Sequence, residues 1–296
     1  MKIRFEYFWP GFNSKDFFLL KYFDEPEIVS DDSYSYLILS VFPNKLLSIK
    51  DSAKIIVFNG EHPSYINDRL VRIGIKPDIQ IGFIDSNSYD YNVEKLYYPF
   101  WHLYYPQFDQ KFIDDIEAKK NITQQEINQK KFCCLINSHD SNNTRKPIYN
   151  VLSNIGRIDC PGVLLNNCDR RLCGTTSEDK IKFMNSYVFN ICSENFFGKL
   201  YFTEKLPQSL NSCCIPIYNG DLSGYNEKIF NKDRIIIIND FSPDSIVQLK
   251  KKIKKLFSNK YDLKKFYSRP IFNPGAMDVY TGFVEEFESK FRSLIS

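Results

Sequence analysis

The sequence predicts an α/β fold built on largely parallel sheets. Short apolar segments rich in β-branched and aromatic residues alternate with segments of helical character along the chain, as expected for a doubly wound sheet. Some apolar segments, such as the IIVF run at 55–58, are continuous, which is typical of strands buried on both faces. With 296 residues and no internal repeat, the chain is long for one core and suits two domains.

Four strands are expected in the first part of the chain, each bounded by turn-forming residues: Ile3–Tyr7, Tyr36–Phe42, Lys54–Phe58 and Ile79–Phe83. A helix is expected at Ser64–Ile73. From Asp109 to Lys131 the composition becomes polar and charged, with helical character. We place a domain boundary within this polar segment.

The alternation of strands and helices restarts after the boundary. The expected strands are Phe132–Ile136, Gly162–Leu165, Tyr187–Cys192, Cys214–Tyr218 and Ile235–Ile238. The expected helices are Lys146–Ile155, Glu178–Ser186, Thr203–Ser212 and Pro243–Phe257. The last of these has the strongest start signal, because Ser242 can cap it and Pro243 suits the first helical position.

A terminal helix is expected after Gly275, where apolar residues recur four positions apart from Phe283 to Ile295. Such a stripe must pack on another part of the protein. We therefore expect an N-terminal domain over residues 1–125, a second domain over residues 126–272, and a C-terminal helix over residues 273–296 that packs back on the first domain.

Composition excludes several classes of protein. A net charge of +3 is too small to indicate a nucleic-acid partner. The basic cluster at 250–255 (KKKIKK) is interpreted as the solvated face of a helix, and a peripheral phosphate or membrane contact stays open. The N-terminus resembles no signal peptide, and no apolar run is long enough to span a bilayer.

The eight cysteines include two adjacent pairs inside apolar strands, which favours buried thiols over a disulfide framework. With three scattered histidines and no CxxC motif, no metal site is expected. We expect a reduced, cytoplasmic compartment, and the sequence leaves the oligomeric state open.

The segment 187–220 is the most informative for function. A buried strand leads into a polar loop and a helix start, and this loop and helix start hold Asn195, Tyr201, Glu204 and Lys205. A cation and polar groups at the head of a helix that follows a buried strand favour a phosphorylated ligand. Tyr201 has an alternative interpretation as a buried structural residue. The cluster predicts an enzyme that uses a nucleotide sugar.

Two further clusters follow expected strands. Glu61 comes directly after strand 54–58, where a carboxylate can accept a proton from a substrate hydroxyl; the alternative is an ordinary loop glutamate. His62, next to a turn expected at Pro63, is a weaker candidate. Arg145, at a helix entrance, can donate to a diphosphate in fork geometry, and a structural salt bridge is an equal alternative.

Several familiar motifs are missing from the sequence. There is no P-loop and no GxGxxG fingerprint, which disfavours NTPases and dinucleotide enzymes. No Asp-x-Asp element follows a strand to hold a metal against a diphosphate. The charge of a departing diphosphate must then be met by Arg145, Lys205 and helix amides.

The order of these motifs resembles the α1,3-fucosyltransferases of glycosyltransferase family 10. SENFFGKLYFTEKL followed by CCIPIYNG resembles the family signature, and VFNGEHP and TRKPIYNVL resemble its upstream Gly-Glu and Arg-bearing elements. Phe58 and Ser193 stand where family members often carry Tyr and an aromatic residue. The match extends over roughly residues 54 to 241 and best fits the soluble bacterial or viral type.

The resemblance implies a GT-B fold, in which two Rossmann-like domains with parallel sheets face a cleft. It also implies GDP-fucose as donor, inversion at the sugar carbon and no obligatory metal, although a divalent ion can stimulate. By position, Glu61 matches the general base, and Arg145 and Lys205 match the cations on the diphosphate. Asn195, Tyr201 and Glu204 match residues around the donor, where Glu204 is also a candidate for stabilising the reacting sugar.

The resulting hypothesis is transfer of L-fucose from GDP-fucose to a hydroxyl of a glycan that contains GlcNAc or Glc. One alternative keeps the fold but uses another nucleotide-sugar donor. Another alternative is a glycan-binding protein without turnover. The acceptor and the linkage depend on loops around residues 8–33 and 85–108 and are not predicted.

Overall fold

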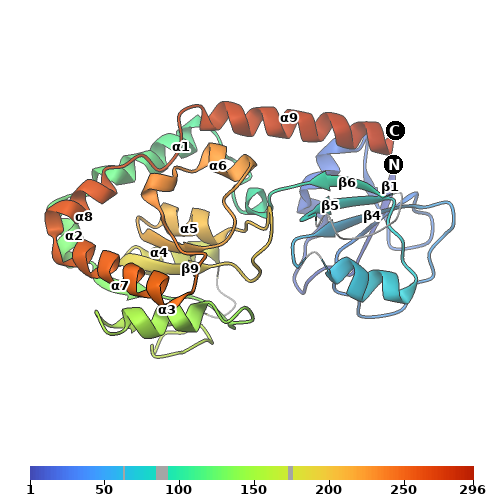
Figure 1. Ribbon diagram of the computed structural model, residues 1–296. Helices are drawn as coiled ribbons and strands as arrows, with labels where there is room; N and C mark the ends of the chain where they lie inside the picture. Colours follow the sequence, from blue (N-terminus) through green and yellow to red (C-terminus); the bar gives the residue numbers. More distant parts are fainter. Residues whose placement is uncertain (63, 85–92, 173–175) are drawn as a thin grey trace. The chain divides into compact units, whose positions relative to one another are not determined.

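The computed structural model describes residues 1–62, 64–84, 93–172 and 176–296. It divides into two compact units, and each is described here by itself (Figure 1). The first unit comprises residues 1–103 and 281–296, and the second comprises residues 104–280. The turn expected at Pro63 and part of the loop expected at 85–108 lie outside the described residues.

The first unit contains a parallel sheet with strand order β2-β1-β3-β4-β5-β6. The strands are β1 (Lys2–Glu6), β2 (Glu27–Ile28), β3 (Tyr36–Leu39), β4 (Lys54–Asn59), β5 (Ile79–Gly82) and β6 (Glu94–Tyr97). The four expected strands are confirmed with shifted ends. The short outer strands β2 and β6 are additional, because edge strands bury fewer side chains and leave a weaker apolar pattern.

The helix expected at Ser64–Ile73 forms in a different way. A π-helical turn covers Ile66–Leu70 and a 3-10 turn covers Val71–Ile73, and Gly74 ends them with a left-handed backbone (φ 83°). Other 3-10 turns of this unit cover Ser14–Asp16 and Phe18–Tyr22. A further 3-10 turn, Phe100–Tyr104, ends at the first residue of the second unit.

Aromatic rings fill much of the first unit's core. The unit also contains most of the terminal helix α9 (Ala276–Ile295), from Thr281 onward. Phe287 packs edge-on against Tyr98, with ring centroids 4.9 Å apart, and the Tyr36 hydroxyl donates to the Ile295 carbonyl at 2.6 Å. The apolar stripe of the helix is thus buried against the first sheet.

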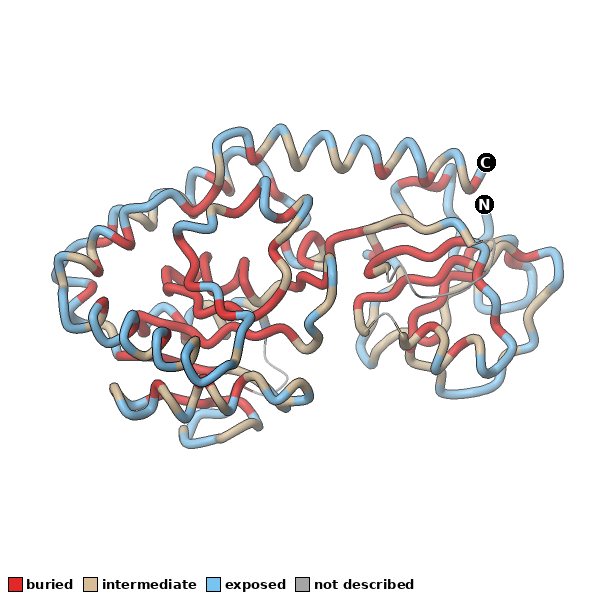
Figure 2. Tube along the Cα trace, viewed as in Figure 1, coloured by how far each residue is buried: buried red, intermediate tan, exposed pale blue. Residues whose placement is uncertain are grey.

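The second unit contains a parallel sheet with strand order β11-β10-β9-β7-β8. The strands are β7 (Lys131–Cys134), β8 (Ile158–Asp159), β9 (Tyr187–Ser193), β10 (Ile215–Asn219) and β11 (Ile236–Ile237). All seven residues of β9 are buried, including the polar Asn190 and Ser193 (Figure 2, red). The two parallel sheets confirm the predicted α/β class.

The strand expected at Gly162–Leu165 is wrong. The sheet uses Ile158–Asp159 instead, and Pro161 lies between that strand and the expected segment. Residues 162–165 form a loop in which Val163 is exposed and Leu165 has a left-handed backbone (φ 53°). An apolar run next to Pro and Gly resembles a strand in sequence although it packs as a loop.

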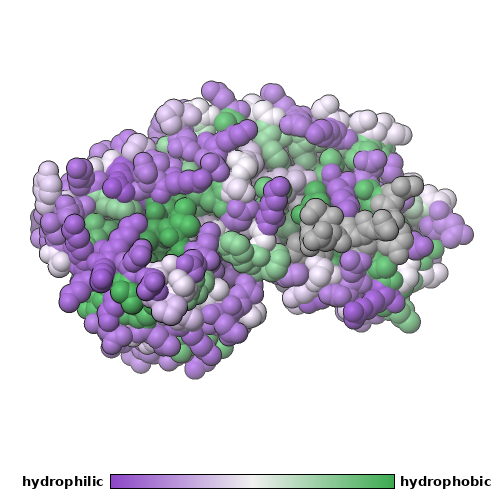
Figure 3. All heavy atoms as spheres, viewed as in Figure 1, coloured by the Kyte–Doolittle hydropathy of each residue, from purple (hydrophilic) through white to green (hydrophobic). Residues whose placement is uncertain are grey.

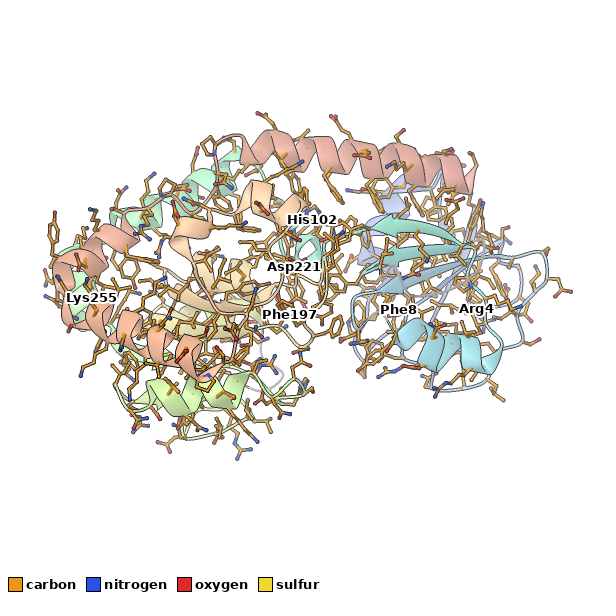
Figure 4. The ribbon with its side chains drawn as sticks, viewed as in Figure 1. Arg4, Phe8, His102, Phe197, Asp221 and Lys255 are labelled. Atoms are coloured by element: carbon orange, nitrogen blue, oxygen red, sulfur yellow. The ribbon has the colours of Figure 1, made fainter. Side chains whose placement is uncertain are left out.

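Eight helices of the described chain lie entirely within the second unit: α1 (Gln110–Glu117), α2 (Gln124–Gln129), α3 (Arg145–Leu152), α4 (Ser177–Met184), α5 (Lys205–Asn211), α6 (Tyr225–Ile229), α7 (Pro243–Ser258) and α8 (Lys260–Tyr267). The expected helices correspond to α3, α4, α5 and α7. As predicted, the Ser242 side chain caps α7. The α7 lysines are solvated around the buried Ile253, and Figure 4 labels one of them, Lys255.

The division between the units falls at 103/104, earlier than the expected 125. The residues between these positions pack with the second sheet's helices. Glu117 accepts hydrogen bonds from the backbone N–H groups of Ile271 and Phe272 at 2.7 and 2.6 Å, and Lys264 donates to the Ile122 carbonyl. The polar composition of residues 109–131 therefore reflects surface helices rather than a linker.

The seven described cysteines are free thiols, and all but Cys168 are buried; Cys173 lies outside the described residues. Burial raises the pKa of Cys133 and Cys192 well above the usual value. Hydrophilic side chains dominate the face in Figure 3. Among the described residues, no helix combines the length and apolar character needed to cross a membrane.

Candidate functional site

The second sheet has a topological switch point between β7 and β9. From β7 the chain crosses over to β8 on one side, whereas β9, β10 and β11 follow on the other side. Ligands of open α/β sheets bind outside the carboxyl ends of the strands at such a point. The two loops that leave these strands, 135–144 and 194–204, are therefore the expected place for a site.

A cavity of about 260 Å³ lies at this switch point; we call it the β7–β9 cavity. Its polar lining is Asn137, Ser138, His139, Lys180, Asn190, Asn195, Glu204, Lys205 and Gln208. Ile136, Leu172, Met184 and Ile191 contribute apolar surface. Three of the five residues predicted around the donor, Asn195, Glu204 and Lys205, thus line one cavity.

Gly162 forms part of the cavity wall and has no room for a side chain. A Cβ atom at this position would lie 2.3 Å from the backbone oxygen of Asn137. A hydrogen bond also joins the two loops, because the Leu164 N–H donates to the Asn137 carbonyl at 3.0 Å. A glycine therefore lets the loop after β8 close against the loop after β7.

Arg145, the first residue of α3, is buried beside the cavity and links the two site loops. Its Nη2 atom donates to the Ser193 carbonyl and to Asn195 Oδ1, both at 2.8 Å, and Nη1 donates to the His139 carbonyl. Burial lowers the pKa of Arg145, opposed by the carboxylates of Asp140 and Glu194. The arginine brings positive charge to the site while its donors bind the protein.

The N-terminal amides of α3 are occupied by a carboxylate of the protein. Asp140 accepts hydrogen bonds from the N–H groups of Thr144, Arg145 and Lys146 at 2.9–3.0 Å. The protein's own carboxylate therefore takes the anion position at this helix end. Sequence reasoning missed this cap because Asp140 lies five positions before the first helical residue.

Lys205, the first residue of α5, lies over a buried carboxylate. Its Nζ atom donates to Glu194 Oε2 at 3.2 Å and to Thr203 Oγ1 at 2.9 Å. Burial alone lowers the pKa of Lys205, but Glu194 and Glu204 raise it above its usual value. The lysine therefore stays charged at the cavity wall.

Glu194 organises the loop after β9. Its side chain is 1% exposed and accepts hydrogen bonds from the Thr203 N–H at 2.9 Å, the Thr203 hydroxyl at 2.6 Å and the Tyr218 hydroxyl at 3.4 Å. No role was predicted for Glu194, Thr203 or the Tyr218 hydroxyl. Burial and Glu194 raise the pKa of Tyr218 well above its usual value. The available signal was a glutamate that directly follows the buried strand β9.

Tyr201 is buried rather than placed on the cavity wall. Its ring meets Phe196 edge-on at 5.6 Å, which matches the structural alternative for this residue. Asp221 Oδ2 accepts from the Leu200 N–H at 2.8 Å and anchors the same loop. Figure 4 labels Asp221 together with Phe197, a half-exposed residue of this loop.

His139 and Lys180 line the cavity but were not predicted. The Nδ1 atom of His139 lies 2.8 Å from the Ser141 hydroxyl. Burial lowers the pKa of His139, and the positive charges of Arg145 and Lys205 lower it further. The two residues are far apart in sequence and come together only in the folded chain, because His139 follows β7 and Lys180 lies on α4.

Glu61 belongs to the first unit and follows the carboxyl end of β4, as predicted. Its N–H donates to Asn59 Oδ1 at 3.0 Å, and Asn59 Nδ2 donates to the His62 carbonyl at 3.2 Å. Gly60 packs against the Phe100 ring so closely that a Cβ atom would lie 2.1 Å from it. The turn that carries the partly exposed Glu61 is thus tightly defined. Nδ1 of His62 accepts from the Ser64 N–H at 3.1 Å.

Among residues 1–62, 64–84, 93–172 and 176–296, no group of three or more His, Cys, Asp or Glu side chains is arranged to hold a metal ion.

The fold is that of GT-B glycosyltransferases. A crystal structure of an α1,3-fucosyltransferase with GDP-fucose matches 97% of this chain and 90% of its own, with a TM-score of 0.63 and 18% identity. A crystal structure of an α1,3-fucosyltransferase with GDP matches the same shares, with a TM-score of 0.61 and 16% identity. These likenesses confirm the predicted fold.

The segment 126–270 matches the family described as "Glycosyltransferase family 10 (fucosyltransferase) C-term". It contains the whole β7–β9 cavity. The predicted resemblance is confirmed, and it supports the prediction of a glycosyltransferase enzyme.

Two curated relatives agree with this assignment. The α-(1,3)-fucosyltransferase FucT of Helicobacter pylori is 31% identical over 110 residues, which is 37% of this chain. A protein of Acanthamoeba polyphaga mimivirus, provisionally named as a fucosyltransferase, is 31% identical over 134 residues, which is 43% of this chain. Each match spans 22% of the relative's own length.

Proposed function

We propose that this protein is an inverting fucosyltransferase that transfers L-fucose from GDP-fucose to a hydroxyl of a GlcNAc- or Glc-containing glycan. The observation that supports this most is the β7–β9 cavity, which lies at the switch point of a family-10 domain and is lined by Asn195, Glu204 and Lys205. An α1,3-fucosyltransferase of the same fold has been crystallised with GDP-fucose.

In the proposed reaction, a hydroxyl oxygen of the acceptor attacks the anomeric carbon of fucose. The new carbon–oxygen bond forms as the bond to the β-phosphate oxygen breaks, and the electron pair of that bond leaves with GDP. Glu61 accepts the hydroxyl proton, which makes the oxygen a better nucleophile. Displacement from the face opposite the leaving group inverts the configuration.

The leaving diphosphate gains negative charge as the bond breaks. Lys205 and Arg145 supply fixed positive charge at the cavity, held by Glu194 and by the two site loops. Charges that are already positioned stabilise the transition state without reorganising. Glu204 and Asn195 are proposed to contact the sugar and ribose hydroxyls, with Glu204 also opposite the positive charge of the sugar ring. Tyr201 is proposed to act behind them, by shaping the donor loop.

The test is turnover with purified protein, measured as GDP release and as acceptor mass. The acceptor panel holds oligosaccharides ending in GlcNAc or Glc, and the donor panel holds GDP-fucose, GDP-mannose and UDP-galactose. We expect GDP-fucose to be preferred, with one deoxyhexose added to the acceptor. The assay with and without EDTA tests the proposal that no metal is obligatory.

The same panels separate the alternatives. Preference for another nucleotide sugar would keep the fold but change the donor. Binding of glycans by saturation-transfer NMR, with no GDP release from any donor, would instead indicate a binding protein.

A further inference from the structure

The cavity contains a cation that the motif-based interpretation does not use. Lys180 lies on α4 and lines the β7–β9 cavity together with Lys205. It takes part in none of the ion pairs formed within the described ranges 1–62, 64–84, 93–172 and 176–296. The neighbouring acid on α4, Asp179, is paired with Arg170 at 3.3 Å. Among the described residues, an ammonium group without a carboxylate partner therefore faces a polar cavity.

The side chains of the two predicted diphosphate cations already donate hydrogen bonds to the protein. Arg145 donates to Ser193, His139 and Asn195, and Lys205 donates to Glu194 and Thr203. Their charges remain, but part of their hydrogen-bonding capacity is used by the protein. A ligand anion in the cavity finds the least engaged cation at Lys180.

The position of Lys180 is fixed by the packing of α4 on α5. Gln208 of α5 donates from Nε2 to the Ser177 hydroxyl at 2.9 Å, and Thr176 caps α4 by accepting from the Asp179 N–H at 3.2 Å. The helix that carries Lys180 is thus joined to the helix that begins at Lys205. Held groups of this kind lose less entropy when they bind a ligand.

We infer that Lys180 donates to a phosphate oxygen of the nucleoside diphosphate and is a third positive group for the leaving diphosphate. This inference rests on the proposed function, because it assigns the same cavity to the donor. A compact lysine charge suits a phosphate oxygen that carries one or two negative charges.

The experiment is calorimetric titration of GDP, guanosine and pyrophosphate into the wild type, K180A, K180R and K182A. Lys182 is the matched control, because it is an exposed lysine on the same helix and its removal changes the net charge equally. Loss of a charge-assisted hydrogen bond predicts that K180A weakens GDP binding about 10- to 100-fold. K180R should recover part of this loss, and K182A should bind like the wild type. Guanosine binding should not change in any variant.

Equal GDP affinities of K180A and the wild type, with the K180A protein folded by circular dichroism, would overturn the inference and leave the proposed donor intact. If the wild type binds neither GDP nor pyrophosphate, both proposals fail. Binding of pyrophosphate without GDP would reject the proposed donor. Weakening of that pyrophosphate binding in K180A would still support Lys180 as a diphosphate ligand.

Discussion

Lys205 and Glu194 form an ion pair in which Nζ lies 3.2 Å from a carboxylate oxygen that is almost fully buried. The carboxylate also holds the backbone and hydroxyl of Thr203, two residues before the lysine. One side chain thus fixes both the start of α5 and the direction of its first cation. Glu194 therefore both stabilises the loop after β9 and positions the charge of Lys205 at the cavity.

Glu194→Gln should lower both stability and activity. The amide cannot accept the same set of hydrogen bonds, and Lys205 loses the carboxylate that holds it. We expect the free energy of unfolding to fall by about 1–3 kcal/mol, measured by urea denaturation, and kcat/KM for GDP-fucose to fall. Glu227→Gln is the control, because Glu227 is half exposed and pairs with Lys232 at the surface. Unchanged stability in Glu194→Gln would show that the carboxylate does not organise the loop.

Glu61→Gln should strongly slow transfer without weakening the binding of GDP. The glutamine keeps the size of the side chain but cannot accept the proton of the acceptor hydroxyl. The expected loss of kcat is about 10²- to 10⁴-fold, measured by GDP release with a saturating acceptor. His62→Gln, changed in the same turn, should retain most of the activity. Full turnover in Glu61→Gln would remove Glu61 from the mechanism.

Two glycine substitutions should change stability in opposite directions. Gly162→Ala places a Cβ atom 2.3 Å from the Asn137 backbone oxygen, and overpacking of this kind costs about 1–3 kcal/mol. Gly282 lies exposed within α9, and an added Cβ atom there would meet nothing within 4 Å. Gly282→Ala should therefore stabilise by about 0.5–1 kcal/mol, through a better helix propensity.

Both glycine variants are compared by denaturant titration and by GDP affinity. Only Gly162→Ala should also weaken GDP binding, because Gly162 lines the cavity and Gly282 does not. Equal behaviour of the two variants would contradict the close contact between the loops after β7 and β8.

His102 should make stability depend on pH. Burial, and secondarily Lys21, lowers the pKa of His102 well below its usual value of 6.5. The unfolded chain then binds the proton more readily than the folded chain. This contribution to stability is complete above about pH 6.5 and is lost as the pH falls toward the folded-state pKa.

The free energy of unfolding, measured from pH 8 to pH 5, should therefore fall with pH in the wild type. It should fall less steeply in His102→Gln. His62→Gln is the control for a partly exposed histidine and should keep the wild-type slope. Parallel curves for the wild type and His102→Gln would show that His102 does not carry the dependence.

Arg234 is a buried charged residue, and its replacement by an apolar residue should not destabilise the protein. None of its three guanidinium nitrogens has a hydrogen-bond partner among the described residues, and the group lies 4.7 Å from the centre of the Tyr267 ring. Burial lowers the pKa of Arg234. Because desolvating an unpaired charge is costly, Arg234→Met should equal or exceed the wild type in free energy of unfolding, by up to about 4 kcal/mol. A loss of stability in this variant would mean that the contact with Tyr267 outweighs desolvation.

The sequence predicted those parts of the fold that have strong local patterns. The apolar run of β9 and the Ser242–Pro243 start of α7 are local signals, and both are confirmed. The strand prediction at Gly162–Leu165 is wrong because its apolar residues are not visibly different from those of an inner strand. Only the pairing of β8 with β7 decides which short segment enters the sheet.

In the candidate site, too, residues with a local sequence signal were predictable and residues brought together by the fold were not. Asn195, Glu204 and Lys205 were predictable because they are close in sequence and follow a buried strand. Lys180 and His139 could not be found in this way, since the crossing order of the strands brings α4 and the loop after β7 to the same cavity. The Asp140 cap required knowledge of where α3 begins.

The burial of the cysteines has a practical consequence. Cys168 is the described thiol with solvent access, and it lies in the segment between β8 and α4 that also contains Gly162 and Leu172 of the cavity wall. Once position 173 is changed to serine, a maleimide dye should attach mainly at Cys168, a short distance along the chain from residues of the β7–β9 cavity. With this one substitution, Cys168 becomes a reporter position for following, in real time, the entry of the proposed nucleotide.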